Sequence, residues 1–328
     1  MTMTTENKYG FKSVFADELT AYIDGKVARG FKAHSFTVHL RKFDDYCNEI
    51  HLSEPTFTVG NTSEWLLKRD GEAATTHYSR INTSKNFLKY LSLKGYDVYV
   101  VRNIRFIDTD FKPHIYTDDE VRRYFYQVDQ FYIPRNKKAA VMYPVLFRTL
   151  YCCGTRLNET LSIRKKDVDL EKGIILLTVT KNGEYRMVVM GEDLRRLYCR
   201  FADKTFYLLS DDDYIFSNSR GNKIDGKEIY NHHRIFLKRA GIPYVGGGEG
   251  PRVHDWRHHH AVYSFKQLSD SGLDMYTALP ILSTYLGHKT IFATEKYLRL
   301  TIELFPYIKN KIQEKAEIIF GGTDNEDD

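Results

Sequence analysis

The stretch VHDWRH, residues 253–258, decides how this chain is interpreted, because it places His254 and Arg257 three residues apart. Side chains at this spacing lie on one face of a helix, so we expect both at the start of a helix. The segment Leu-Gly-His then ends at His288, 31 residues after Arg257. Tyr297 lies nine residues beyond His288. The last third of the chain therefore carries an ordered set of one guanidinium, two imidazoles and a phenol.

Two segments upstream add further cations. Arg156 lies in CGTRLNE (153–159), and Lys181 lies in the Lys-Asn-Gly turn of TVTKNGEYRMVV (178–189), between two runs typical of strands. Cutting a phosphodiester requires cationic donors for its non-bridging oxygens, an in-line nucleophile and an acid for the leaving oxygen. The planar fork of arginine suits the first task, and nearby cations activate a tyrosine nucleophile. The residue types therefore indicate phosphoryl transfer to a tyrosine.

The order and spacing of these segments resembles the tyrosine recombinase (phage-integrase-like) family. The resemblance covers about residues 10–300, with residue-level matches within 153–300. The catalytic set that it implies is Arg156, Lys181, His254, Arg257, His288 and the nucleophile Tyr297. Glu159 matches the acidic position of the family and is expected to orient Arg156, whereas Cys153 stands where threonine is usual.

The resemblance also implies a reaction and its partners. Members of the family cut DNA through a 3′-phosphotyrosyl intermediate that conserves the energy of the broken bond, so no metal, cofactor or ATP is expected. The implied partners are double-stranded DNA recombination sites, other copies of the chain (a homotetramer on DNA, a monomer or dimer when free) and, in some systems, accessory proteins. The N-terminal part is long enough for a core-site-binding domain without an additional arm-site-binding domain. That length favours a simple recombinase of a transposon or integrative element, with Xer-like dimer resolution of chromosomes or plasmids as the alternative.

Other functions and other sites stay open at this point. A nicking-closing enzyme of the type IB topoisomerase kind would use the same chemistry. A sequence-specific DNA-binding regulator with a silent site, or a helical scaffold, would use none of it. The run from His258 to His260, with His254 four residues before His258, also fits part of a zinc site. It lacks the HExxH pattern, and the cysteines lie far away in sequence, so we expect no metal.

Composition sets broad limits. The chain has 328 residues, 42% of them hydrophobic, and a net charge of +5 despite the acidic end DNEDD. This modestly basic balance permits a polyanionic partner without requiring one. There is no run of 18 apolar residues and no signal-like N-terminus. We therefore expect no membrane partner and a cytoplasmic, nucleoid-associated protein of a bacterium or archaeon, with its four cysteines reduced.

Apolar periodicity predicts helices throughout the N-terminal part, over residues 14–28, 34–50, 61–69 and 73–94. An extended segment over 96–113 and a capping box that starts at Thr117 follow. These features separate a helical core-site DNA-binding domain, 1–110, from a catalytic domain, 111–328. The DNA-binding residues expected on the polar side of helix 73–94 are Thr76, Ser79, Arg80 and Thr83.

The catalytic part has a mixed pattern. Three short strands are expected at 168–170, 174–180 and 185–190. Helices are expected at 137–152, 192–203, 225–240, 254–269, 276–286, 291–299 and, as an amphipathic C-terminal helix, 303–319. Helices around a small antiparallel sheet make the fold class α+β.

Overall fold

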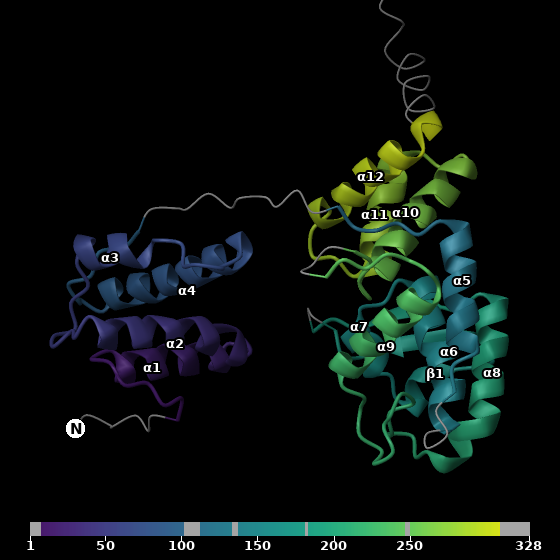
Figure 1. Ribbon diagram of the computed structural model, residues 1–328, viewed down its shortest axis with the longest axis horizontal. Coiled ribbons are helices and arrows are strands. Elements are labelled where there is room, and N and C mark those ends of the chain that lie inside the picture. Colours follow the sequence, from purple (N-terminus) through teal and green to yellow (C-terminus); the bar gives the residue numbers. More distant parts are fainter. Residues whose placement is uncertain (1–7, 102–111, 133–136, 181–182, 247–249, 309–328) are drawn as a thin grey trace, which may run out of the picture. The chain divides into compact units, whose positions relative to one another are not determined.

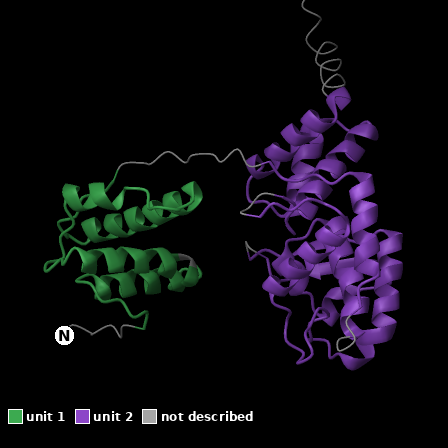
Figure 2. Cartoon of the chain, viewed as in Figure 1, with its two compact units in different colours: residues 1–111 green, residues 112–328 purple. Residues whose placement is uncertain are grey.

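The computed structural model describes residues 8–101, 112–132, 137–180, 183–246 and 250–308 (Figure 1). The chain divides into two compact units, Met1–Phe111 and Lys112–Asp328 (Figure 2). The sequence analysis placed the boundary one residue earlier, between residues 110 and 111. Each unit has its own hydrophobic core, so each is described by itself.

The first unit consists of the four predicted helices. They are α1 (Ala16–Ala28), α2 (His34–Glu49), α3 (Val59–Trp65) and α4 (Ala74–Leu93). Phe43 on α2 is at the centre of the core, where its ring contacts those of Phe15, Phe57 and Phe87 at centroid distances of 5.0–6.2 Å. Aromatic side chains from separate segments therefore hold the helices together.

The start of α3 differs from the prediction. The sequence analysis placed the start of this helix at residue 61, whereas Thr58 caps the helix by accepting a hydrogen bond from the Asn61 backbone NH at 3.3 Å. The Asn61 side chain completes the capping box by accepting from the Thr58 backbone NH at 3.0 Å. The helix therefore begins at Val59 and ends at Trp65, four residues before the predicted end.

The placement of Arg80 corrects one predicted DNA contact. Its side chain is buried, and its guanidinium donates to both carboxylate oxygens of Glu72 and to the carbonyls of Trp65 and Leu67. The Arg80 hydrogen bond lowers the pKa of Glu72 to about 2. Arg80 therefore lies inside the unit and ties the segment after α3 to α4. The other three predicted contacts on α4 remain half-buried at its surface: Thr76, Ser79 and Thr83.

We predict that Arg80→Met destabilises the first unit, because the substitution leaves the Glu72 carboxylate and two carbonyls without their donor. Removing one partner of a buried ion pair typically costs about 3–5 kcal/mol. Denaturant unfolding followed by Trp65 fluorescence, in a Trp256→Phe background, measures the change. Lys89→Met on the exposed side of α4 is the control and should leave the unfolding free energy within about 0.5 kcal/mol of its starting value. Equal stabilities of the two variants would contradict the structural role of Arg80.

The second unit confirms the α+β class. Its helices are α5 (Asp118–Asp129), α6 (Lys137–Cys153), α7 (Leu157–Leu161), α8 (Glu192–Thr205), α9 (Gly226–Arg239), α10 (Asp255–Asp270), α11 (Met275–Leu286) and α12 (Phe292–Leu304). Its strands are β1 (Val168–Asp169), β2 (Ile174–Leu177) and β3 (Arg186–Val189), antiparallel in the order β1-β2-β3. The short helix α7 was not predicted. The capping box of α5 is present at Thr117.

Helix α10 connects the two parts of this unit's core. It packs against α6 on one side and against α11 and α12 on the other (Figure 1). Trp256 in its first turn stacks on Tyr116 with ring centroids 3.8 Å apart. A second cluster of buried apolar side chains fills the space between α10, α11 and α12. The predicted catalytic segments therefore come together where the first turn of α10 meets the C-terminal end of α11.

The predicted helix 303–319 is not one helix in the part that the structure describes. Helix α12 continues to Leu304, the chain leaves the helix at Phe305, and residues 306–308 are helical again. Leu304 is half exposed, whereas Ile308 is buried, so these two members of the predicted apolar stripe do not share a face. The other members, at 312, 316 and 319, lie outside the described residues. None of the helices within the described ranges is long and apolar enough to cross a membrane.

Candidate active site

The site is organised by the C-terminal end of α11. The backbone NH of His288 donates to the carbonyl of Ser283 at 3.1 Å, and that of Gly287 donates to the carbonyl of Thr284 at 3.0 Å. This is a Schellman C-cap, which requires a left-handed residue. Gly287 adopts φ +65°, so the glycine of the Leu-Gly-His segment ends the helix.

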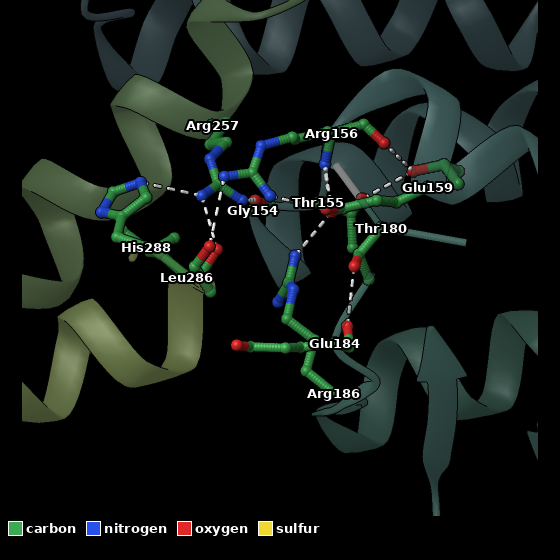
Figure 3. A network of polar contacts seen from close by, with 12 residues as sticks. Gly154, Thr155, Arg156, Glu159, Thr180, Glu184, Arg186, Arg257, Leu286 and His288 are labelled. Atoms are coloured by element: carbon green, nitrogen blue, oxygen red, sulfur yellow. Dashed lines mark hydrogen bonds and ion pairs between the residues drawn. The ribbon is translucent and has the colours of Figure 1, made fainter. Parts of the chain in front are cut away.

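Three arginines bind the three carbonyls that follow. Arg186 donates to Tyr285 O at 2.7 Å, and Arg156 donates to Gly287 O at 3.3 Å. Between them, Arg257 donates to Leu286 O at 2.6 Å (Figure 3). Carbonyls in the last turn of a helix have no intrahelical donor and form the negative end of the helix dipole. The helix end therefore gathers guanidinium groups from three separate segments of the chain.

Arg257 is the most deeply buried of these groups. It comes from α10, is 1% exposed, and its Nη1 also donates to the carbonyl of Gly154 at 2.7 Å. Burial, followed by the neighbouring Arg156, lowers the pKa of Arg257 to about 10. The guanidinium is still charged at neutral pH, and both of its terminal nitrogens are held by backbone oxygens.

Arg156 precedes α7 and is oriented by Glu159, as expected. The Glu159 carboxylate accepts from the Arg156 backbone NH at 2.9 Å and from its Nη1 at 2.7 Å. The Arg156 side chain is 21% exposed, whereas that of Glu159 is 2% exposed. The carboxylate therefore fixes the inner edge of the guanidinium and leaves part of it accessible.

His288 is held in one tautomer. Its Nε2 lies 3.0 Å from Nη2 of Arg257, and its Nδ1 lies 2.7 Å from Oγ1 of Thr294. Arginine can only donate, so Nε2 must be the acceptor and Nδ1 must carry the hydrogen. Burial, followed by Arg257, lowers the pKa of His288 to about 4. The imidazole is therefore neutral at physiological pH.

Tyr297 lies against this group on α12. It is 1% exposed, and its ring stacks on that of His288 with an interplanar angle of 14° and a centroid distance of 6.0 Å. The ring of His258 lies 5.3 Å away on centroids, and Nζ of Lys296 lies 5.1 Å from the Tyr297 ring centroid. Burial raises the pKa of the Tyr297 phenol, and the adjacent Arg257 opposes that rise. Arg257 is thus placed to favour a phenolate.

Two residues of the predicted catalytic set remain, Lys181 and His254. Lys181 lies outside the described residues, but the stem of its turn is closed by a 2.7 Å hydrogen bond from Thr180 Oγ1 to the carbonyl of Glu184. His254 is exposed at the N-terminus of α10, with its ring edge-on to that of His258 at 4.8 Å. Within the described ranges, no three His, Cys, Asp or Glu side chains gather as a metal ion requires.

Comparison with known proteins identifies the family. Residues 117–303 match the model of the phage integrase family, and this segment is more than half of the chain. The chain belongs to the phage integrase family. Its members, the tyrosine recombinases, cleave and rejoin DNA through a phosphotyrosine intermediate. The predicted recombinase chemistry is therefore confirmed.

Curated relatives match over most of their length. A putative integrase/recombinase, y4rB, of Sinorhizobium fredii is 24% identical over 93% of this chain and 99% of its own. The tyrosine recombinase XerA of Saccharolobus solfataricus is 26% identical over 88% of this chain and 89% of its own. The matches thus include both integrase-like and Xer-type proteins.

Solved structures show the same fold at low sequence identity. XerH bound to its difH substrate has a TM-score of 0.65 at 19% identity, over 81% of this chain and 75% of that chain. A lambda integrase dimer bound to a core site has a TM-score of 0.61 at 14% identity, over 85% of this chain and 93% of that chain.

Sequence reasoning missed two side chains of this recombinase's site. Arg186 is the first residue of β3, and Thr294 lies three residues before Tyr297. The signal for Arg186 was present in its strand, where Arg186 shares a face with buried Val188 while Met187 and Val189 are exposed. An arginine on the inward face of a strand needs an internal partner. No comparable signal marked Thr294.

We predict that acid destabilises the second unit before its carboxylates titrate. Burial lowers the pKa of His233, His258 and His259 to about 3, 2 and 4, against about 6.5 in an unfolded chain. Below pH 6.5 the unfolded chain binds protons that the folded chain does not. Stability is therefore fully present above that pH and falls between pH 6.5 and 4, by up to about 1.4 kcal/mol per pH unit for each histidine.

Denaturant unfolding at a series of pH values measures this slope, with Trp256 as the reporter in a Trp65→Phe background. His258→Phe is the matched variant, because it keeps a ring and removes one titrating group. Its slope should be smaller by about 1.4 kcal/mol per pH unit. A stability that does not change between pH 6.5 and 4.5 would show that these histidines take up protons without unfolding.

We also predict that Gly154→Ala is more destabilising than Gly272→Ala. Both glycines have positive φ, +58° and +86°, so each alanine meets a backbone penalty of about 1–2 kcal/mol. Only at Gly154 would the added Cβ overlap the His260 ring, with Cγ of that ring 2.9 Å away. This overpacking adds about 1–3 kcal/mol. Thermal unfolding of the two variants gives the comparison, and equal losses would contradict the close approach.

Proposed function

We propose that this chain is the site-specific recombinase of a mobile element and that Tyr297 is its nucleophile. The observation that carries the proposal is the placement of Arg156 and Arg257 on consecutive carbonyls at the end of α11, with Tyr297 beside Arg257. Two guanidiniums at one point provide a site for a phosphate with two non-bridging oxygens. The phenol is the nucleophile adjacent to that point.

In the proposed reaction, Arg156 and Arg257 bind the non-bridging oxygens of the scissile phosphate and stabilise the charge that develops on them. The Tyr297 oxygen attacks phosphorus and releases its proton to solvent, and the bond from phosphorus to the 5′-oxygen breaks. Lys181 protonates the leaving oxygen, and His254 and His288 complete the site. The result is a 3′-phosphotyrosyl bond and a free 5′-hydroxyl, and attack by a 5′-hydroxyl on the same phosphorus reverses the step.

We propose that the first unit binds the core recombination site through the half-buried polar face of α4, with Thr76, Ser79 and Thr83 as contacts. Hydroxyl groups at the surface of a helix can donate to phosphates and to base edges. Arg80 is removed from the proposed contacts because its guanidinium is committed to Glu72 and to backbone carbonyls. Assembly as a homotetramer on two sites, from free monomers or dimers and with accessory proteins in some reactions, belongs to the same proposal.

Integration or excision of a mobile element is preferred over dimer resolution. The relative y4rB, named as an integrase/recombinase, covers 93% of this chain, and the transposon Tn1549 integrase bound to DNA shares its fold at a TM-score of 0.60. The Xer-type relatives keep dimer resolution as the second candidate.

We predict that Tyr297→Phe abolishes covalent capture of DNA while leaving site binding intact, because phenylalanine has the same ring without the attacking oxygen. The recombinase is incubated with nicked fragments of the DNA that flanks its gene. The mixture is denatured, and protein-linked DNA is isolated and sequenced. The sequences give the site and the cleavage position, and repeats that bound an inserted element would support the mobile-element role.

Tyr285→Phe is the matched control, since Tyr285 is another partly buried tyrosine near the site and its ring stacks on His260 at 5.6 Å. This control should form the adduct at the wild-type level. Persistence of the adduct in Tyr297→Phe would place the nucleophile elsewhere. Loss of site binding together with the adduct would leave Tyr297 with a structural role only.

A further inference from the structure

Arg186 lies in the middle of the site although none of the steps above uses it. It pairs with Leu177 across the β2–β3 ladder, and its side chain is 10% exposed. Nη1 donates to Tyr285 O at 2.7 Å. Nη2 donates to Oε2 of Glu159, also at 2.7 Å, and Figure 3 shows these two side chains. One planar group thus joins β3, the glutamate that orients Arg156 and the end of α11.

The Glu159 carboxylate is divided between two arginines. Oε1 accepts from Arg156 Nη1 at 2.7 Å, and Oε2 accepts from Arg186 Nη2 at 2.7 Å. Burial by itself would raise the pKa of Glu159, but Arg186 and then Arg156 hold it below its usual range. The charge of Arg186 is therefore the largest single influence that lowers the pKa of this buried carboxylate. The charge of Arg156 is correspondingly less neutralised by Glu159 than it would be in an isolated pair.

The absence of a side chain at Gly287 leaves room for the Arg186 side chain. A Cβ at Gly287 would lie 2.9 Å from Cδ and 3.2 Å from Nε of Arg186. The glycine of the Leu-Gly-His segment therefore serves the helix cap and also leaves room for this side chain. Arg186 also begins the strand that follows the Lys181 turn, so its two anchors fix the base of that hairpin against the site.

We propose that Arg186 is a positioning residue for strand cleavage: it takes part of the Glu159 charge and one carbonyl of α11, so that Arg156 keeps its charge and orientation for the scissile phosphate. This inference rests on the proposed function. Without Arg186, the buried carboxylate has Arg156 as its one side-chain cation among the contacts described. Arg156 is then drawn into a closed pair with Glu159 and binds the phosphate poorly.

The test is a double-mutant cycle on the rate of covalent adduct formation, with the DNA site identified by capture. Arg186→Met should lower that rate by about 10²-fold, the effect typical of losing one oxyanion donor, while the affinity for a single site stays near that of the wild type. Arg186→Lys keeps a charge but cannot bind Tyr285 O and Glu159 in the planar geometry, so its rate should be intermediate. Arg196→Met, which removes an exposed arginine of α8, should cleave at the wild-type rate.

The decisive variant combines Arg186→Met with Glu159→Gln. If Arg186 acts by sharing the charge of Glu159, a neutral glutamine releases Arg156, and the double variant cleaves faster than Arg186→Met alone. A merely structural role gives additive losses, so a double variant slower than Arg186→Met would overturn the proposal. Wild-type cleavage by Arg186→Met would overturn it as well.

Two controls distinguish a failure of the proposed role of Arg186 from a failure of the proposed function. If Arg186→Met does not fold, as judged by thermal unfolding, the cycle is run with Arg186→Lys, and the same sign of coupling is required. Failure of the proposed function would appear as the absence of any Tyr297-dependent adduct with the wild type. Failure of the inference would appear only among Arg186 variants of an enzyme that does form the adduct.

Discussion

The unpaired carbonyls at the end of α11 are the constraint on which the site depends. An α-helix leaves its last carbonyls without donors. Here the Schellman cap satisfies Ser283 and Thr284, and guanidiniums satisfy the three carbonyls that follow. The three guanidinium groups thus come together at the end of the helix, where consecutive backbone carbonyls set their spacing. Their geometry is set by the helix rather than by flexible side-chain contacts alone.

Gathering cations in this way has an electrostatic cost. Burial and the neighbouring Arg156 lower the pKa of Arg257, and the same environment keeps nearby imidazoles neutral. The helix dipole and the shared Glu159 carboxylate offset part of the repulsion. The remaining positive charge favours an anion at the end of α11, such as the DNA phosphate of the proposed reaction. The site is therefore electrostatically incomplete by itself, as a site that binds a charged transition state should be.

A similar arrangement of an arginine, a glutamate and backbone carbonyls stabilises the first unit. Arg80 donates to Glu72, to the carbonyl of Trp65, which is the last residue of α3, and to the carbonyl of Leu67, two residues further on. A buried arginine, one glutamate and carbonyls at a helix end thus recur in both units. In the first unit the guanidinium is fully committed and buried. In the second, Arg156 is partly exposed, so part of its guanidinium is accessible from outside the unit.

The sequence by itself determined most of the helices, the three strands, the α+β class and the family, because these depend on periodicity and on short motifs with fixed spacing. It also predicted that Glu159 orients Arg156, a contact between residues three positions apart. Only the tertiary structure decided the roles of Arg186, whose partners lie 27 and 99 residues away, and of Arg257, which binds a carbonyl 103 residues away. It likewise decided that Arg80 points inward, since a polar helix face does not reveal whether a guanidinium finds internal acceptors. Such hydrogen bonds join segments that meet only after folding, and local sequence patterns contain no record of them.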